Sequence, residues 1–340
     1  MSVGTSSETV APVPAAPRAR AADLRETPRE RWIRRAERRG PLVVLVLVCA
    51  AATIASPSFA SWSDISTILG GNAFVWLLAL GMTFVITTGG IDLSVGSLYA
   101  LGGVLAARGA ATGSWAAILL PLAVCAAWGA VQGLLIAYGR MAPFIVTLAG
   151  LLGARGLLQA ITNQGSATYL VPQNSWFLHL GAGTWVPVGI VAVLFAAGWI
   201  LMERTAYGAS LTAIGGNENS AVLLGLPVAR AKVLVYLLSG TLAGAAGALG
   251  GARLGSGVTT VGVGYELTAI ASVVIGGTLL TGGYGTIGGT VCGVLLLAVI
   301  HQLIDQYLSQ YGSAMTNAIN GAFLAAVVLA QAALERSRRR

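Results

Sequence analysis

Long apolar runs recur through nearly the whole 340-residue chain, and this feature constrains its fold most strongly. A helix needs about 20 residues to cross the hydrocarbon core of a bilayer. The runs therefore predict an all-α, polytopic membrane protein, with about ten transmembrane helices in a glycine-rich bundle. The predicted spans are Leu42–Pro57, Ile65–Ile86, Leu93–Ala111, Trp115–Tyr138, Phe144–Thr162, Val186–Met202, Val233–Leu249, Leu267–Leu280, Ile287–Ile304 and Ala318–Leu334. Eight spans are the alternative, and the short run 267–280 is either tilted or re-entrant.

Basic residues gather at both ends of the chain. Nine of the 20 Lys and Arg residues lie in Arg18–Arg39 and four in Arg336–Arg340. Cytoplasmic segments of membrane proteins carry such an excess, so we expect both termini in the cytoplasm and an even number of spans. The segment Asn163–Trp185 has no Lys or Arg and is expected outside. No basic stripe or aromatic platform accompanies the charge, so no nucleic acid is expected as a partner.

The same pattern divides the chain into three parts. Residues 1–40 are predicted to be a basic cytoplasmic tail that is retained, with a short helix from Pro28 to Arg39 on the anionic lipid surface. Residues 41–334 form the transmembrane domain, which includes a cytoplasmic loop at 203–232. Residues 335–340 form a second basic tail. The expected location is a membrane that the chain crosses several times, with both termini in the cytoplasm.

A polar motif interrupts the apolar sequence between the second and third runs. It comprises Thr88, Gly89, Gly90, Asp92, Ser94 and Gly96. Asp92 is the only formal charge between Asp64 and Arg108, and a carboxylate at membrane depth is costly unless partners hold it. The two adjacent glycines can break a helix, and Asp92 or Ser94 can cap the next one. The motif is thus either part of a translocation pathway or a capped turn without contact to cargo.

The loop 203–232 contains the second candidate site. Asn217 or Asn219 can cap a short helix, Ser220–Leu224, which Gly225 and Pro227 would end. Small residues such as Ala221 would let this helix fit into a groove of a partner, where Glu218 could pair with a basic group. The candidate coupling residues are Gly216, Asn217, Glu218, Ser220, Ala221 and Gly225. The alternative is an interfacial helix that lies on the membrane.

Glycine patterns suggest close helix packing. Small residues repeat every three to four positions in Ser239–Gly251, a spacing that lets helix backbones approach. The stretch Gly276–Gly289 lacks the Gly-Lys-Ser/Thr ending of a phosphate-binding loop. Its Thr281–Gly283 repeats the Thr-Gly-Gly of Thr88–Gly90, which hints at an internal repeat.

No arrangement of residues indicates an enzyme. The two histidines, His179 and His301, lie on different segments, and the carboxylates are scattered. The cysteines Cys49, Cys125 and Cys292 have no metal-ligand spacing. We therefore expect no catalytic residue, no metal site and no cofactor.

Four blocks of the chain resemble one family, the permease subunits of bacterial ABC importers for sugars of the ribose/galactofuranose/autoinducer-2 type. The resemblance covers roughly residues 40 to 332, and the first block, Thr-Gly-Gly-Ile-Asp-Leu-Ser-Val-Gly, is quite specific. Ser220 stands where the family usually has the first of two adjacent alanines. The four blocks are 88–96; 143–148 with 154–156; 207–208 with 213–217 and 221–225; and 237–240.

The resemblance implies a type II ABC importer permease-like fold and a non-catalytic subunit that forms a sugar pathway. It implies ABC ATPase subunits on the cytoplasmic loops, an extracytoplasmic sugar-binding protein, and a second permease chain that is identical or different. It places the permease in the lipid of the bacterial cytoplasmic (inner) membrane. Branched-chain amino acids or nucleosides are the alternative substrates of the same machinery. An autonomous secondary transporter or channel is the other alternative. It would need a coupling-ion site, for which Asp92 alone is thin support.

Overall fold

The computed structural model is helical throughout, apart from two paired strands of two residues each. It describes residues 28–55, 59 and 61–308, and six single residues between 318 and 329; of 28–39 and 305 only the backbone is described. Residues 1–27 of the predicted tail 1–40, the predicted tail 335–340 and most of the last predicted span lie outside the described residues. The elements are α1 Pro28–Ala55, α2 Trp62–Gly71, α3 Ala73–Thr87, α4 Val95–Ala110, α5 Ser114–Ala137, α6 Pro143–Ile161, β1 Tyr169–Leu170, α7 Leu178–Gly181, α8 Trp185–Glu203, α9 Ala206–Gly216, α10 Glu218–Leu223, α11 Val228–Leu254, β2 Ser256–Gly257, α12 Tyr265–Ile275 and α13 Ile287–Leu308.

The predicted class, an all-α membrane protein, is confirmed. By length and composition, five of the described helices can cross a membrane, and the pair α2–α3 makes a sixth if it counts as one bent span. The predicted number of ten remains a prediction, because α4 and α12 are short and the last run is largely undescribed.

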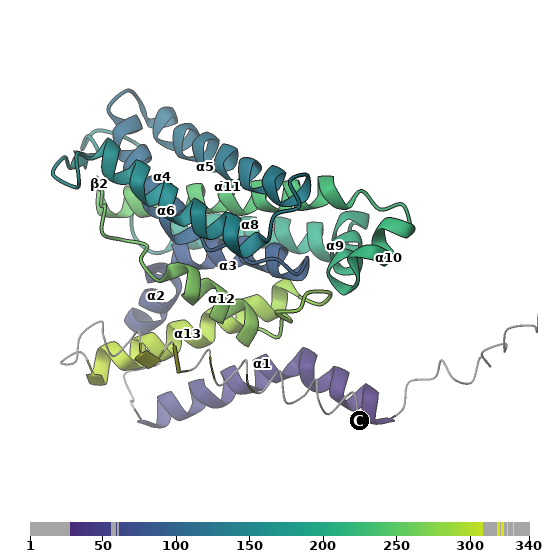
Figure 1. Ribbon diagram of the computed structural model, residues 1–340. Coiled ribbons are helices and arrows are strands. Elements are labelled where there is room, and N and C mark those ends of the chain that lie inside the picture. The colour runs from purple at the N-terminus through teal and green to yellow at the C-terminus, as the bar shows by residue number, and fades with distance from the viewer. Residues whose placement is uncertain are drawn as a thin grey trace, which may run out of the picture.

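Helix α11 forms the centre of the bundle, and α3, α4 and α5 pack around it (Figure 1). Within the described residues, 67% of its most apolar window is buried, against 28% in each of α5, α6 and α8. A helix that is apolar all round belongs in an interior. Helices α5, α6 and α8 expose apolar side chains, as expected of helices that face lipid.

Glycines let α11 approach its neighbours, as the small-residue spacing of Ser239–Gly251 predicted. A Cβ on Gly240 would overlap the carbonyl oxygen of Cys125 in α5, and one on Gly247 would overlap the carbonyl of Tyr99 in α4. Because lipid gives helices no hydrophobic drive to associate, contacts of this closeness have to supply the packing energy.

The predicted span Ile65–Ile86 is not one straight helix. Helices α2 and α3 meet at Asn72 with a bend of 47°. The Asn72 side chain donates a hydrogen bond to the carbonyl of Ile68 (3.4 Å), and the backbone N–H of Asn72 donates one to the carbonyl of Gly70. A short amide side chain that competes for backbone groups in this way disrupts a helix.

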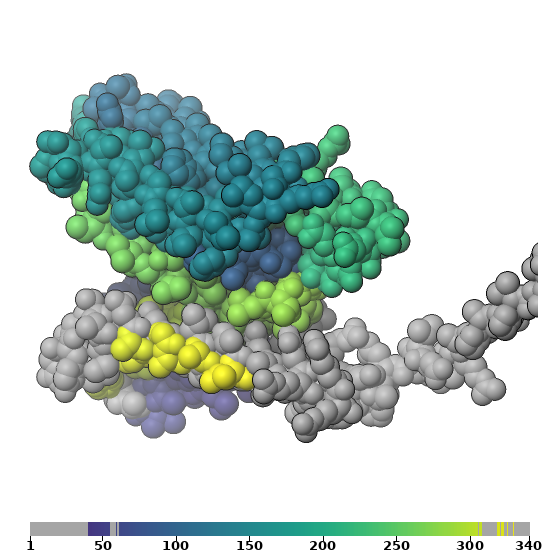
Figure 2. Space-filling model, viewed as in Figure 1, coloured from purple at the N-terminus to yellow at the C-terminus, as the bar shows by residue number. Residues whose placement is uncertain are grey.

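The two candidate loops lie at opposite ends of α11. At one end β1 pairs antiparallel with β2, Tyr169 opposite Gly257, and α7 packs on the end of α11. At the other end, α9 and α10 stand out from the body of the molecule (Figures 1 and 2). The segments 163–185 and 203–232 are thus separated by the length of the bundle, as their opposite predicted sides require.

We predict that Gly240→Ala lowers the melting temperature of the purified protein in detergent, whereas Gly189→Ala does not. The Cβ at Gly240 would force α11 away from α5, an overpacking that costs about 1–3 kcal/mol and exceeds the gain in helix propensity of about 1 kcal/mol. Gly189 on α8 has no neighbour within 4 Å of an added Cβ, so it gains propensity alone. Equal melting temperatures for the two variants would contradict the packing argument.

Candidate functional site

The polar motif forms a break of seven residues between α3 and α4, and its buried carboxylate organises that break. Asp92 is completely buried. Its Oδ1 accepts hydrogen bonds from the backbone N–H of Ser94 (3.0 Å) and from the Ser94 hydroxyl (2.6 Å). Its Oδ2 accepts one from the hydroxyl of Ser239 on α11 (2.8 Å). Three donors offset the loss of water around the charge.

The prediction that Asp92 or Ser94 caps the following helix needs correction. Among the described residues, Ser94 makes no side-chain capping bond to α4. Its hydroxyl donates to Asp92 and also lies 3.2 Å from Oε1 of Gln132 on α5. Asp92 bonds the residue just before the helix instead of the first free N–H groups inside it. Tertiary contacts hold the break, and capping does not.

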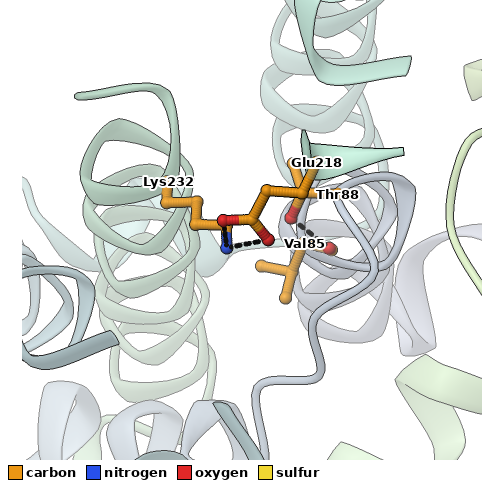
Figure 3. Close-up of polar contacts among 4 residues, drawn as sticks. All are labelled: Val85, Thr88, Glu218 and Lys232. Atoms are coloured by element: carbon orange, nitrogen blue, oxygen red, sulfur yellow. Dashed lines mark hydrogen bonds and ion pairs between the residues drawn. The ribbon is translucent and has the colours of Figure 1, made fainter. Parts of the chain in front are cut away.

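A third helix also contacts the break, and glycine shapes its backbone. The hydroxyl of Thr147 on α6 donates to the carbonyl of Ile91 (3.1 Å). Thr88 closes α3 by donating its hydroxyl to Val85 (2.8 Å), a bond shown in Figure 3. Gly89 has a φ of 79°, which an L side chain rarely adopts. A Cβ on Gly90 would overlap the Tyr236 hydroxyl, so no larger residue fits there.

Glycines from three distant parts of the chain meet beside this break. A Cβ on Gly215, the last residue but one of α9, would overlap the carbonyl oxygen of Thr87. The N–H of Gly283 donates to the same carbonyl of Thr87 (2.9 Å). A Cβ on Gly282 would come within 2.7 Å of the Gly89 nitrogen. We name this contact the glycine junction; its members are Thr87, Gly89, Gly215, Gly216, Gly282 and Gly283.

The junction brings together the two Thr-Gly-Gly sequences that the chain repeats. Whether they reflect an internal duplication remains a hypothesis. The glycines of both sequences have the same physical role. Because they lack side chains, three segments of the chain can approach one another at backbone distance.

The predicted helix in the loop 203–232 exists as α10, and its predicted cap is confirmed. The Asn217 side chain accepts a hydrogen bond from the N–H of Ser220 (2.9 Å). Asn217 is also the residue that ends α9, so a single residue links the two helices. Gly225, with a φ of 77°, follows the helix as expected. Helix α9, which precedes it, was not predicted.

One expectation about the side chains of α10 was wrong. Ala221 is buried (1% exposed) and packs in the chain's own core, so it anchors α10 and does not face a partner. Both oxygens of Glu218 lie 2.7 Å from Nζ of Lys232 (Figure 3), but its side chain is 54% exposed, so pairing with a partner's basic group stays a prediction. Apolar side chains also project outward: Leu223 is 88% exposed and Leu224, just after the helix, 77%.

Helix α9 is itself held to α11. The Tyr207 hydroxyl donates to the carbonyl of Ala231 (3.2 Å), and burial raises the pKa of Tyr207 to about 12. Together with the ion pair between Glu218 and Lys232, this bond fixes α9 and α10 on the end of α11.

Comparison with known proteins identifies the family. Residues 65–332 match the family model described as branched-chain amino acid transport system / permease component. The chain is 40% identical over 273 residues to the ribose import permease protein RbsC of Escherichia coli, a match that covers 78% of this chain and 85% of that protein. The chain belongs to this permease family.

Other relatives of the permease are similar over the same region. RbsC of Bacillus subtilis is 41% identical over 269 residues, which is 77% of this chain and 83% of that protein. The fructose import permease protein FruG of Bifidobacterium longum is 36% identical over 276 residues, or 76% and 80%. No solved structure matches the permease.

The sequence blocks that resemble this family converge in the permease. Thr147, Ser239 and Asp92 come from three of them and meet at the break. The motif itself gave no sign of Gln132 or of Ser239, which lies 147 residues from Asp92. The recurrence of hydroxyl residues inside otherwise apolar blocks was the available signal for Thr147 and Ser239.

We predict that Asp92→Asn is tolerated better than Asp92→Leu. Asparagine retains one oxygen for the two donors of Ser94, whereas leucine leaves the Ser94 N–H and the Ser239 hydroxyl without their acceptor, at about 1–3 kcal/mol each. Membrane abundance and melting temperature measure the difference. Asp92→Asn with normal abundance and no uptake at all would show instead that the negative charge itself acts in transport.

Proposed function

We propose that the chain is the transmembrane permease subunit of an ATP-driven, binding-protein-dependent importer, and that it forms the translocation pathway for a small sugar. The main support is similarity, at 36–41% identity over more than three quarters of the chain, to proteins named as ribose and fructose import permeases. The family description mentions branched-chain amino acids, which makes these the second candidate substrate. The names of the relatives favour sugar, and membership of the family argues against an autonomous secondary transporter.

The α9–α10 end is the proposed docking site of the ATPase subunits. Val222, Leu223 and Leu224 expose apolar side chains on a helix that stands outside the bundle, and we define these three residues as the α10 tip. A contiguous exposed apolar surface of this kind is typical of a protein interface. In this proposal ATP hydrolysis takes place on the partner, both termini and the α10 tip are cytoplasmic, and the extracytoplasmic binding protein approaches the opposite end.

The glycine junction is the proposed link between that docking site and the pathway. Asn217 joins α10 to α9, and Gly215 at the end of α9 contacts Thr87 where α3 stops. Backbone atoms in direct contact cannot move past one another without displacing the segment on the other side. A shift of α10 would therefore move the start of the break that Asp92 holds. A second permease chain would complete the pathway.

We predict that Leu223→Asp prevents co-purification of the ATPase and abolishes ATP-dependent ribose uptake, with normal membrane abundance. The side chain is 88% exposed, so an added charge leaves the chain's own core intact. Leu170→Asp is the matched control for co-purification of the ATPase, since Leu170 is 70% exposed at the opposite end. The Ala221→Trp variant, in contrast, should have a lower membrane abundance, because tryptophan overfills a buried site.

An ATPase that still co-purifies with the Leu223→Asp variant would refute the docking assignment. Uptake of leucine but not ribose by the wild-type complex would favour the branched-chain amino acid candidate over sugar.

We predict that Gly215→Ala uncouples the transporter whereas the neighbouring Gly216→Ala does not. An added Cβ at Gly215 would overlap the Thr87 carbonyl, but one at Gly216 has nothing within 4 Å. The Gly215→Ala complex should keep its ATPase subunit and lose at least tenfold in uptake per ATP hydrolysed. Equal coupling ratios in the two variants would exclude transmission through this contact.

A further inference from the structure

A second charged site lies away from Asp92, between Arg155 on α6 and Glu266 in the first turn of α12. Both side chains are half-buried, and their opposite charges attract each other. Nη1 of Arg155 donates to the carbonyls of Thr259 (2.9 Å) and Val261 (3.1 Å). Arg155 thereby holds the loop that leads from β2 down to α12.

Glu266 lies deep in the bundle. Its carboxylate contacts Gly96, where a Cβ would overlap it. Gly96 is the second residue of α4, so at 1.5 Å per residue it is about 21 Å from the helix's far end at Ala110. Arg155 lies about 18 Å along α6 from Pro143 by the same measure. Both distances fall within a hydrocarbon core of about 30 Å.

An aromatic cluster fixes the start of α12 and therefore the position of Glu266. The ring of Tyr265 stacks on Phe74 with a centroid distance of 5.1 Å, and it lies 5.4 Å from the ring of Tyr99. Side chains locked by packing hold their neighbours in a defined geometry, which a binding site requires.

The face that carries this pair cannot be turned to lipid. Val263 and Leu267, on either side of Glu266, are 73% and 53% exposed, so the described part of the chain leaves this face open. Ionisable side chains at membrane depth face a bundle interior or a water-filled cavity, because exposure to hydrocarbon is too costly. Either an aqueous pathway or a second permease chain has to cover it.

We propose that Arg155 and Glu266 line the translocation pathway and form hydrogen bonds with the hydroxyl groups of a sugar in transit. This inference rests on the proposed function. The pair has no net charge, as suits a neutral solute, and it offers both donors and acceptors. Both hydrogen bonds of Arg155 within the described residues use Nη1, although the guanidinium carries five N–H donors. The Glu266 carboxylate accepts backbone hydrogen bonds at the start of α12, and its remaining lone pairs and the other donors of Arg155 can bind vicinal hydroxyls.

Thiol accessibility tests whether this face is wet. Val263→Cys and Leu267→Cys are made in a chain whose Cys49, Cys125 and Cys292 are replaced by serine, and the whole complex is reconstituted into liposomes. A membrane-impermeant thiol reagent should modify Cys at 263 and 267 at least tenfold faster than at the control position Val193, which is 69% exposed on the apolar face of α8. Ribose with its binding protein should slow the reaction, whereas leucine should not.

Charge removal supplies the second measurement. Glu266→Gln and Arg155→Gln should each reduce ribose uptake at least tenfold with the ATPase still bound, whereas Val193→Ala on the apolar face of α8 should not. The labelling experiment keeps both charges, so it tests whether this face is in contact with water even if the charge variants fold poorly.

Two results would overturn the inference while leaving the proposed function intact. One is labelling at Val263 no faster than at Val193 in a complex that imports ribose. The other is wild-type ribose uptake by Glu266→Gln and Arg155→Gln variants that still assemble with the ATPase. Absence of any ATP-dependent uptake by the wild-type complex would instead overturn the proposed function.

Discussion

The buried carboxylate of Asp92 is the interaction on which the rest of this structure depends. An unpaired charge in the interior of a membrane protein would be prohibitively costly, and three hydrogen bonds from Ser94 and Ser239 offset that cost. One of the donors belongs to α11, the central helix. The carboxylate thus fastens the break between α3 and α4 to the core of the bundle and sets where both helices end.

The absence of a Cβ has two different uses in this chain. Along α11, glycines at helical spacing let three helices pack at backbone distance, which provides cohesion where lipid gives no hydrophobic drive. At the glycine junction the glycines sit at the ends of elements, and they bring the backbones of α9, the α3–α4 break and the α12–α13 loop into contact. The first arrangement builds a fixed core, and the second joins parts that transport would move.

The exposed surface is of three physical kinds. The apolar side chains of α5, α6 and α8 suit contact with lipid. The equally apolar α10 tip projects from the end of the bundle, where we propose that the ATPase subunits cover it. The Arg155–Glu266 pair lies on an open face, and contact with lipid does not suit its charges. The first two surfaces differ in position more than in composition, so hydropathy alone does not separate them.

The sequence by itself determined the all-α membrane class, the limits of α5, α6 and α8 to within one residue, and an asparagine cap at Asn217 or Asn219, of which the structure has Asn217. Each of these depends on local hydropathy or on a bond across a few residues. Only the tertiary structure decided the bend at Asn72, the inward direction of Ala221 and the pairing of Asp92 with Ser239. It also decided the meeting of Gly89, Gly215 and Gly282. These features depend on which distant backbones come into contact, and a one-dimensional pattern of apolar runs does not carry that information.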